Sequence, residues 1–384
     1  MTTPTRQVGN TRTLRPRFIT TEKFPLSFAS YELRNLHPTA DYRASAQFTN
    51  GLGQHILFNH QHHGSKTGQI ERYSADYSVR DVGGDGFFRP YQTRGVDQNP
   101  KTGTVCFAEY GDYGDAANFR VMRSTDSLNF TEVFSMPVPA TVDWSSDEHI
   151  RHFHVVAADP GDNDIWYLSS GDHQNHTHFW VSTDDALTWT QIHKANIDIK
   201  AVDYCVDATH IYWSKDLGGG GIYRMDKATY TIETLIADGV LDGSGYSFIP
   251  VEHGWVSCHS NTTGKRSNVY LIDTSFNHHL LTTIPGSLAG FKSRGVGGND
   301  LFYMHATFDN REGKVAVGQV FEDAGTYYMA FESFDGRNMM TELFSISGQA
   351  FAYEHRVNTG AIGSPMTDEF YFGTSSGTVM LMTL

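Results

Sequence analysis

Short runs of alternating apolar and polar residues dominate the chain, and clusters of Gly, Asp, Asn and Pro separate them. Runs of about four to eight residues bounded by turn residues are typical of β-strands at regular spacing. No stretch shows the sustained period that an amphipathic helix would need. The pattern therefore predicts an all-β protein built from many short strands.

A unit of strand, turn, strand, loop, strand, turn and strand repeats along the chain. The clearest copies cover about residues 88–136 and 149–192, and weaker ones cover about 200–236, 245–284 and 291–346. Runs near the two ends supply a first unit and a partial last one. Four-stranded units of roughly 40–55 residues are typical of β-propeller blades.

We therefore predict one β-propeller domain over residues 1–384. Seven blades agree best with the repeats, and six or eight stay open because the unit boundaries are uncertain by a few residues. We expect N-terminal sequence near residues 15–35 to pair with the last unit and close the ring, since closure removes free sheet edges.

Composition and charge limit the classes of binding partner and the cellular locations that the sequence supports. The formal net charge is −14, which argues against a binder of nucleic-acid backbones, because such proteins normally present a basic surface. No apolar run is long enough for a membrane-spanning helix, and no signal peptide is visible, although an extracellular location is slightly favoured. The three cysteines, Cys106, Cys205 and Cys258, are scattered, which predicts buried thiols rather than disulfides. We expect a monomer.

The hairpin Ser182–Thr190 resembles the Asp-box of sialidase-type (BNR) repeats, Ser-x-Asp-x-Gly-x-Thr-Trp, with Ala186 in place of the usual Gly. A degenerate copy lies at Ser124–Glu132. The aspartate of such a turn caps nearby backbone N–H groups. In its families the motif is structural and lies away from the active face, so the resemblance supports a propeller but gives no support for sialidase chemistry. The matching positions are Ser182, Asp184, Thr188 and Trp189.

The unit that contains this hairpin resembles blades of BNR-like propeller polysaccharide lyases, namely ulvan lyases and rhamnose–glucuronate lyases. In those families one histidine lies on an inner strand, and a second follows about twenty residues later. His154 and His173 have a similar separation. The resemblance implies a β-elimination on a uronate-containing glycan.

Polar residues are expected to converge on one face of the propeller. The start of each inner strand and the end of each second strand should meet there, and histidine is frequent at these positions. The strand starts are Arg94, His152, His154, Tyr204, Tyr246, Arg294, His355 and Arg356. The strand ends are His60, His62, His63, Asp112, Asp172, His173, Lys215, Asp216, His259 and His305.

A lyase needs a base for the C5 proton, an acid for the leaving oxygen and a cation for the uronate carboxylate. We expect His154, His173 and Tyr246 to transfer protons, although His154 on its apolar run could equally be a core residue. Arg94 and Arg294 share an Arg-Gly-Val context and would grip a carboxylate, or hold neighbouring blades together. The other expected substrate-binding residues are Lys215, Tyr204, His305, His355 and Arg356.

The sequence requires no cofactor. The cluster His60, His62 and His63 is a weak candidate for a divalent cation such as calcium, since imidazole is a common metal ligand.

Two other functions stay open. A carbohydrate-binding propeller without chemistry would use aromatic platforms such as Tyr110, Tyr113 and Trp213. A sialidase-like glycoside hydrolase would use an arginine triad, for which Arg94, Arg294 and Arg356 are available. The Arg-Ile-Pro signature of that family is absent, and its catalytic carboxylates cannot be assigned.

Overall fold

The computed structural model of the protein describes most of the chain between Ser30 and Thr383. The described residues are 30–35, 43–50, 52, 54–60, 68–74, 78–88, 90, 95–99, 101–251, 254–261, 266–285, 292–293, 305–309, 314–323, 326–334, 339–347, 351–353, 369–374 and 378–383. Within these ranges the regular structure is almost entirely β-strand, with two short 3-10 turns, η2 (Gln174–His176) and η3 (Ile197–Ile199).

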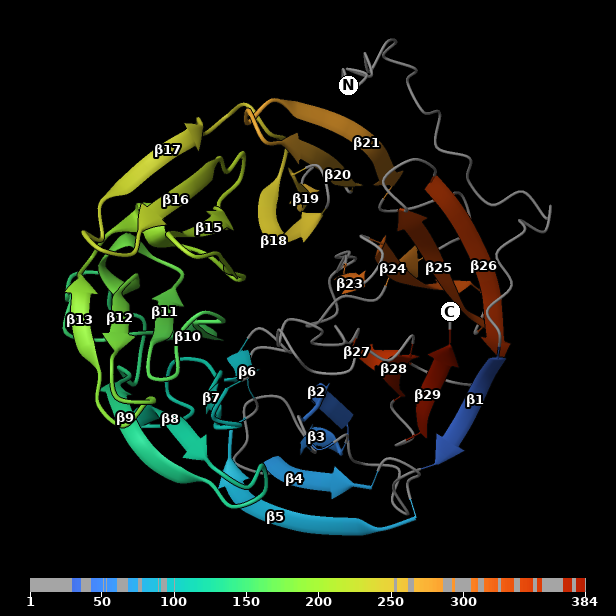
Figure 1. Ribbon diagram of the computed structural model, residues 1–384, viewed down its shortest axis with the longest axis horizontal. Helices are drawn as coiled ribbons and strands as arrows, with labels where there is room; N and C mark the ends of the chain where they lie inside the picture. Colours follow the sequence, from blue (N-terminus) through green and yellow to red (C-terminus); the bar gives the residue numbers. More distant parts are fainter. Residues whose placement is uncertain are drawn as a thin grey trace, which may run out of the picture.

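The described strands form seven antiparallel sheets, six of four strands and one of five. Figure 1 shows the sheets arranged around a common centre, like the blades of a propeller. The prediction of an all-β propeller is therefore confirmed. The extent of the domain over the whole chain stays a prediction.

Strand order within the sheets follows the chain, apart from the closing sheet and an extra strand pair. One sheet comprises β2 (Arg43–Thr49), β3 (His55–His60), β4 (Gly68–Tyr73) and β5 (Arg80–Phe87). The next along the chain comprises β6 (Val96–Gln98), β7 (Val105–Ala108), β8 (Asn118–Ser124) and β9 (Thr131–Pro137). The third comprises β10 (His152–Ala158), β11 (Trp166–Gly171), β12 (Phe179–Ser182) and β13 (Thr190–His193). The fourth sheet comprises β14 (Cys205–Val206), β15 (His210–Ser214), β16 (Ile222–Asp226) and β17 (Ile232–Ile236). The fifth comprises β18 (Ser244–Val251), β19 (Gly254–Asn261), β20 (Arg266–Asp273) and β21 (His278–Pro285). The five-stranded sheet comprises β22 (Lys292–Ser293), β23 (His305–Asp309), β24 (Lys314–Asp323), β25 (Thr326–Phe334) and β26 (Met339–Ser347).

The closing sheet combines the two ends of the described chain. It contains β27 (Phe351–Tyr353), β28 (Glu369–Thr374) and β29 (Thr378–Thr383), and β1 (Ser30–Asn35) pairs antiparallel with β29. Figure 1 shows β1 at the outer edge of this sheet, beside β29. The early strand therefore occupies an edge that β29 would otherwise expose.

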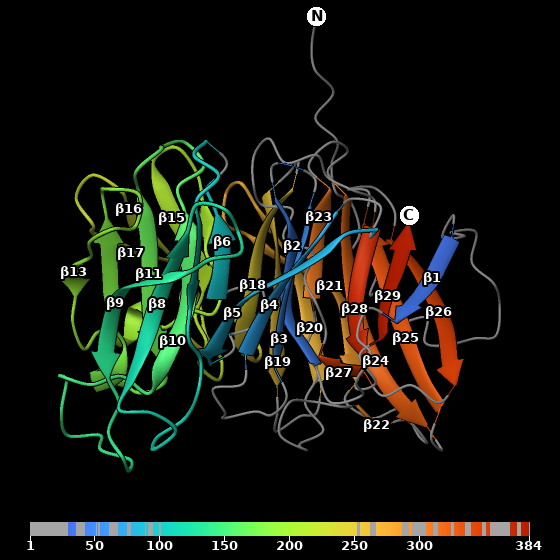
Figure 2. The ribbon, with the colours of Figure 1, turned by 90° about the horizontal axis from the view of Figure 1, so that it is seen from below.

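The strands run between two opposite faces, as Figure 2 shows. We call the face where β10 begins and β11 ends the site face, and the face of the β10–β11 and β12–β13 turns the turn face. Because successive strands are antiparallel, the starts of the inner strands and the ends of the second strands share the site face.

The core consists of apolar layers between neighbouring sheets. Phe119 of β8, Val156 of β10 and Trp166 of β11 belong to one layer, which joins the β6–β9 and β10–β13 sheets. Every residue of β10 and β11 is buried, whereas β9 and β13 have no buried residue. The inner strands have a neighbouring sheet on each side, so both of their faces are buried, whereas the outer strands are exposed to water.

The Asp-box-like hairpins adopt the expected local geometry on the turn face. Oδ1 of Asp184 accepts hydrogen bonds from the backbone N–H groups of Leu187, at 3.1 Å, and Thr188, at 2.8 Å. Asp126 caps the degenerate copy in the same way, with the N–H groups of Leu128 at 2.9 Å and Asn129 at 2.7 Å. Both aspartates therefore serve the turn itself.

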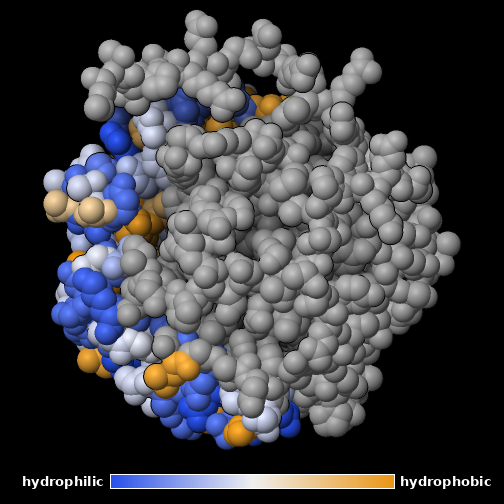
Figure 3. Space-filling model, turned by 45° about the vertical axis from the view of Figure 1, so that its right-hand side comes forward, coloured by the Kyte–Doolittle hydropathy of each residue, from blue (hydrophilic) through white to orange (hydrophobic). Residues whose placement is uncertain are grey.

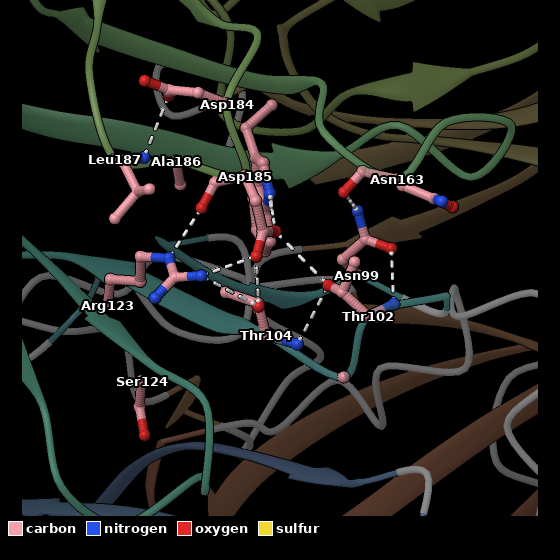
Figure 4. A network of polar contacts seen from close by, with 12 residues as sticks. Asn99, Thr102, Thr104, Arg123, Ser124, Asn163, Asp184, Asp185, Ala186 and Leu187 are labelled. Carbon is pink, nitrogen blue, oxygen red and sulfur yellow. Dashed lines mark hydrogen bonds and ion pairs between the residues drawn. The ribbon is translucent and has the colours of Figure 1, made fainter.

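Asp185, next to the capping aspartate, links two sheets (Figure 4). Its Oδ2 forms an ion pair with Nη2 of Arg123 at 2.6 Å and accepts from Oγ1 of Thr104 at 2.6 Å. Its Oδ1 accepts from Nε1 of Trp166 at 3.1 Å. Arg123 and Thr104 belong to the β6–β9 sheet and its turns, so the contact connects that sheet to the β10–β13 sheet.

Where Figure 3 shows described residues, along one margin of that view, hydrophilic residues predominate and the apolar ones form separate spots. Among the described residues, none of the helical segments has the length and apolar character needed to cross a membrane. Cys106 and Cys205 are buried, as predicted. The side chain of Cys258 lies outside the described residues.

Candidate functional site

A polar cluster lies on the site face, where the β10–β13 sheet meets its two neighbours. Arg151 precedes β10, and His152 and His154 are its first and third residues. The pairing of β10 with β11 shifts register between Phe153 and Val155, so His154 occupies a β-bulge. A bulge re-aims a side chain and is frequent at functional sites. Both imidazoles are almost completely buried.

Each imidazole is fixed by a backbone carbonyl of a neighbouring sheet. Nδ1 of His152 lies 2.7 Å from the carbonyl oxygen of Gly111, and Nδ1 of His154 lies 2.9 Å from that of Ala201. A carbonyl only accepts, so each Nδ1 carries the proton and donates it. The two Nε2 atoms face each other at 3.2 Å.

Asp172, which directly follows β11, meets both rings. Its Oδ2 lies 3.1 Å from Nε2 of His152, and its Oδ1 lies 3.3 Å from Nε2 of His154. Burial alone would raise the pKa of the Asp172 carboxyl, but the charge and hydrogen bonds that the two imidazoles offer when they are protonated on Nε2 outweigh burial and hold the pKa well below its usual range. Burial lowers the pKa of His152, although Asp172 opposes that effect. Asp172 is therefore a carboxylate.

Two cations and two further carboxylates surround this centre. Nη1 of Arg151 lies 2.6 Å from Oδ2 of Asp172, and the rest of its guanidinium forms a bidentate pair with Asp112 at 3.0 Å per contact. Nζ of Lys200 lies 3.7 Å from Asp172 and 3.5 Å from Asp216. In the part of the chain that the structure describes, three carboxylates thus face two permanent cations.

Aromatic side chains lie beside the cluster. The ring of Tyr110 stacks on His152, with centroids 4.0 Å apart. Tyr113 approaches the Arg151 guanidinium, 5.6 Å from the ring centroid, and packs edge-on against Trp144. The imidazole of His173 packs against Trp144, with the ring centroids 4.5 Å apart and the ring planes tilted by 33°. Trp144 is 42% exposed, so this aromatic group reaches solvent next to the charged cluster.

His173 and His154 lie on the same face but in different surroundings. His173 is partly exposed, and its Nδ1 accepts a long hydrogen bond from the N–H of Asn175 at 3.4 Å. The ring proton of neutral His173 therefore sits on Nε2. His154 is only 2% exposed and is held by Ala201 and Asp172. Its predicted role as a proton carrier stays a prediction, and its surroundings favour a fixed ligand.

Two other predicted substrate-binding residues are buried. Nζ of Lys215 pairs with Asp198 at 2.9 Å and with Asp238 at 2.8 Å. The ring of Tyr204 packs in the apolar layer between the β10–β13 and β14–β17 sheets. Such contacts are typical of residues with a structural role. Contact of Lys215 and Tyr204 with a substrate stays a prediction.

The remaining predicted residues fall outside what the structure describes. This holds for the whole of Arg94, Arg294, His355, Arg356, His62 and His63, and for the side chains of Tyr246, His305 and His60. The aromatic Trp213, suggested as a sugar platform, is fully buried in the core. Its position excludes sugar stacking, because an inner apolar layer covers the ring.

Sequence reasoning placed His152, Asp112, Asp172 and Asp216 on this face but gave them no role. It missed Arg151 and Lys200. Arg151 directly precedes the inner strand, and the run Arg151–His154 was the available signal. Lys200 lies in a connection after η3, and no pattern in the sequence marks it.

His152, His154 and Asp172 form a group that could hold a metal ion, because one donor atom from each lies within 4.8 Å of the others. The donors are two imidazole nitrogens and a carboxylate oxygen. This group of three side chains can bind a cation, hold a proton between the two rings, or orient Asp172 toward solvent.

No protein-family model matches the sequence, and no curated protein matches it. Several solved structures do match it in fold. The GH74 enzyme of Niastella koreensis is 14% identical, with a TM-score of 0.58, and the match covers 91% of this chain and 53% of that chain. This chain therefore spans about half the length of that enzyme.

Two other solved structures match along nearly their whole length. An oligogalacturonate lyase in complex with manganese is 12% identical, with a TM-score of 0.51 and coverage of 92% of this chain and 93% of that chain. YCF48 bound to a D1 peptide is 9% identical, with a TM-score of 0.52 and coverage of 94% and 98%. At these identities the likeness concerns the fold alone, and the chain is similar to β-propellers of differing function.

Proposed function

We propose that the protein is a polysaccharide lyase that cleaves a uronate-containing glycan by β-elimination. The observation that supports this most is the conjunction, on one face, of imidazoles, a guanidinium and an exposed indole. Arg151, His173 and Trp144 all lie within this group. A propeller neighbour that is an oligogalacturonate lyase agrees with the reaction class, although fold likeness alone does not assign function.

The reaction needs two proton movements. A base removes the C5 proton of the uronate, the C4–O bond breaks, and a C4–C5 double bond forms. An acid returns a proton to the departing oxygen, so no water is consumed. A cation near the carboxylate stabilises the charge that develops when C5 loses its proton.

His173 is the described residue best suited to meet the sugar. It is partly exposed, and its Nε2–H is the free end of the ring in the tautomer that Asn175 selects. It would donate to the leaving oxygen. Tyr246 and His154 stay as proposed partners for the C5 proton. Arg94 and Arg294 stay as the proposed grip on the carboxylate, because only a guanidinium offers a planar fork.

The second candidate is a glycan-binding propeller without chemistry. The specific observation in its favour is Trp144, an exposed indole supported by Tyr113 and His173. Such a platform would bind a sugar ring whether or not bond cleavage follows. Extracellular location and a monomeric state also stay predictions.

The test is a panel of uronate polysaccharides incubated with the protein, with ultraviolet absorbance of the unsaturated uronate as readout. A lyase produces that absorbance, whereas a hydrolase or a binder does not. A hydrolase would release reducing ends without it, and a binder would show affinity alone. The absence of unsaturated product across the panel, with binding retained, would replace the lyase by the second candidate.

Variants then assign the roles. His173→Ala should reduce turnover by about 10²–10⁴-fold, the usual range for a general acid or base, while the thermal midpoint stays near that of the parent. His154→Ala should lower both the midpoint and the rate, because the ring is buried. A lowered midpoint with a normal rate would remove His154 from the reaction. His279→Ala, on an exposed outer strand, is the matched control.

A further inference from the structure

We propose that His152, His154 and Asp172 bind a divalent transition-metal ion such as Zn²⁺. This inference does not rest on the proposed lyase activity, because the site can be occupied in a binder as well. It rests on the direction of the ring nitrogens, the spacing of the donor atoms, the local charge balance and the access to solvent.

The first step is the count of ring protons. A neutral imidazole has one N–H, and in both rings the carbonyl contact places it on Nδ1. The Nε2 atoms of His152 and His154 then present lone pairs toward each other at 3.2 Å and toward the Asp172 carboxylate. Acceptors that point at acceptors need a positive charge between them, which a metal ion bound to both Nε2 atoms would supply, as would a second proton on one of the rings.

The carbonyl contacts are also those expected behind metal-bound histidines. Metal ligands commonly donate their second ring N–H to a carbonyl or carboxylate, which fixes the tautomer and the ring orientation. Here Gly111 and Ala201 provide the two carbonyls, one from each neighbouring sheet. The ring positions are therefore set before any ion arrives.

The spacing of the donor atoms agrees with one shared ion. The two Nε2 atoms are 3.2 Å apart, and each lies next to a different oxygen of Asp172, Nε2 of His152 at 3.1 Å from Oδ2 and Nε2 of His154 at 3.3 Å from Oδ1. In a tetrahedral site with metal–ligand bonds of roughly 2.0–2.1 Å, neighbouring donor atoms lie about 3.3–3.4 Å apart. The Asp172 carboxylate would bind the shared ion either through both oxygens or after a rotation that turns one oxygen toward both rings.

The surrounding charges leave room for the ion. Asp112 engages Arg151 through two contacts, and Asp216 lies near Lys200. Among the described residues of the cluster, the three carboxylates exceed the two permanent cations by one charge. A divalent ion would change this single excess negative charge to a single net positive charge. Each carboxylate oxygen of Asp172 can accept more than one partner, so the oxygens can contact an ion and a cationic side chain together.

The site is also reachable. Both rings are buried, but the Asp172 side chain is 26% exposed and marks the side that faces solvent. An ion held by three protein ligands would keep a position open there for water or another oxygen ligand, as in catalytic zinc sites.

The donor set selects the kind of metal. Two imidazoles and one carboxylate suit zinc, iron or manganese, whereas calcium prefers six to eight oxygen ligands. The calcium suggested by the sequence is therefore a poor match to this site. The run His60–His63 is a separate candidate, and the experiment must distinguish it.

The test is direct binding. The full chain, stripped with a chelator, is titrated with Zn²⁺ by calorimetry, and metal content is measured after dialysis. We expect one ion per chain and a higher thermal midpoint with Zn²⁺, because an ion that binds only the folded state stabilises it. Substitution by Co²⁺ should give the visible absorption of a low-coordinate nitrogen and oxygen site.

Variants locate the ion. Asp172→Asn should weaken Zn²⁺ affinity by at least about tenfold, and His154→Gln should remove stoichiometric binding, with folding checked by circular dichroism. His259→Gln is the matched control, because His259 is equally buried but binds Ser257 and Gly243. A second variant set replaces His62 and His63.

Three outcomes would overturn the proposal. The first is the absence of stoichiometric binding by Zn²⁺, Mn²⁺ or Co²⁺, which would leave a shared proton as the positive charge between the rings. The second is full binding in Asp172→Asn and His154→Gln. The third is loss of binding only in the His62 and His63 variants, which would move the ion to that run.

Discussion

Gly171 lies directly against the imidazole of His154. A Cβ atom built on Gly171 would be 2.2 Å from Cε1 of His154, a separation that real atoms do not reach. Gly171 is also the last residue of β11, immediately before Asp172. The missing side chain therefore allows the histidine ring and the carboxylate to share one small space.

Gly171→Ala should displace the ring of His154. Overpacking of this kind typically costs about 1–3 kcal/mol of stability, and we expect weaker Zn²⁺ binding in addition. Calorimetric titration and the thermal midpoint measure the two effects. Gly218→Ala is the control, since a Cβ there meets nothing within 4 Å. Normal Zn²⁺ affinity in Gly171→Ala would show that the ring position is unimportant for the ion.

Asp185→Ala should destabilise the protein without affecting the site face. The substitution leaves Arg123 and Nε1 of Trp166 without their shared carboxylate, and loss of one partner of a largely buried ion pair costs about 3 kcal/mol. Urea unfolding measures the change. Asp226→Ala should cost less, because Asp226 caps only its own exposed turn. Equal losses in the two variants would contradict a link between sheets.

Acid should weaken the fold through buried histidines. Burial lowers the pKa of His178 to about 4 and that of His259 to about 4. An unfolded histidine has a pKa of about 6.5, so between pH 6.5 and 4 the unfolded chain binds protons that the folded chain does not. The free energy of unfolding therefore falls as pH is lowered through this window.

Chemical unfolding at several pH values measures that slope. His178→Gln should flatten it, whereas His279→Gln, at an exposed position, should leave it unchanged. The same slope in His178→Gln as in the parent would mean that His178 does not contribute.

Trp144→Ala should weaken glycan binding. Loss of an aromatic stacking surface costs about 1 kcal/mol, or roughly a fivefold rise in Kd. Affinity for glycan fragments measures the effect. Leu187→Ala is the control, because Leu187 is an exposed apolar side chain on the turn face. Unchanged affinity in Trp144→Ala would remove the indole from the binding surface.

The repeat pattern predicted the architecture because the fold depends on local information. Strand length, turn residues and apolar runs such as Val155–Ala158 are visible in sequence, and each blade uses them in the same order. The capping role of Asp184 was also predictable, since its partners lie within four residues.

The site was less predictable because its contacts join distant segments. His152 meets Gly111, His154 meets Ala201, and Arg151 joins Asp112 to Asp172. None of these pairs has a characteristic spacing. The topology placed several of the residues on one face, but the β-bulge that turns His154 toward Asp172 has no signal in the sequence.

The pairing of β1 with β29 has a consequence for synthesis on the ribosome. Strand Ser30–Asn35 is among the first described segments to be made, and its partner Thr378–Thr383 follows roughly 340 residues later. At about 5–20 residues per second, the first strand waits roughly 20–70 s for its partner. During that time its backbone donors and acceptors depend on water, a chaperone or a temporary neighbour, and the nascent ring stays open.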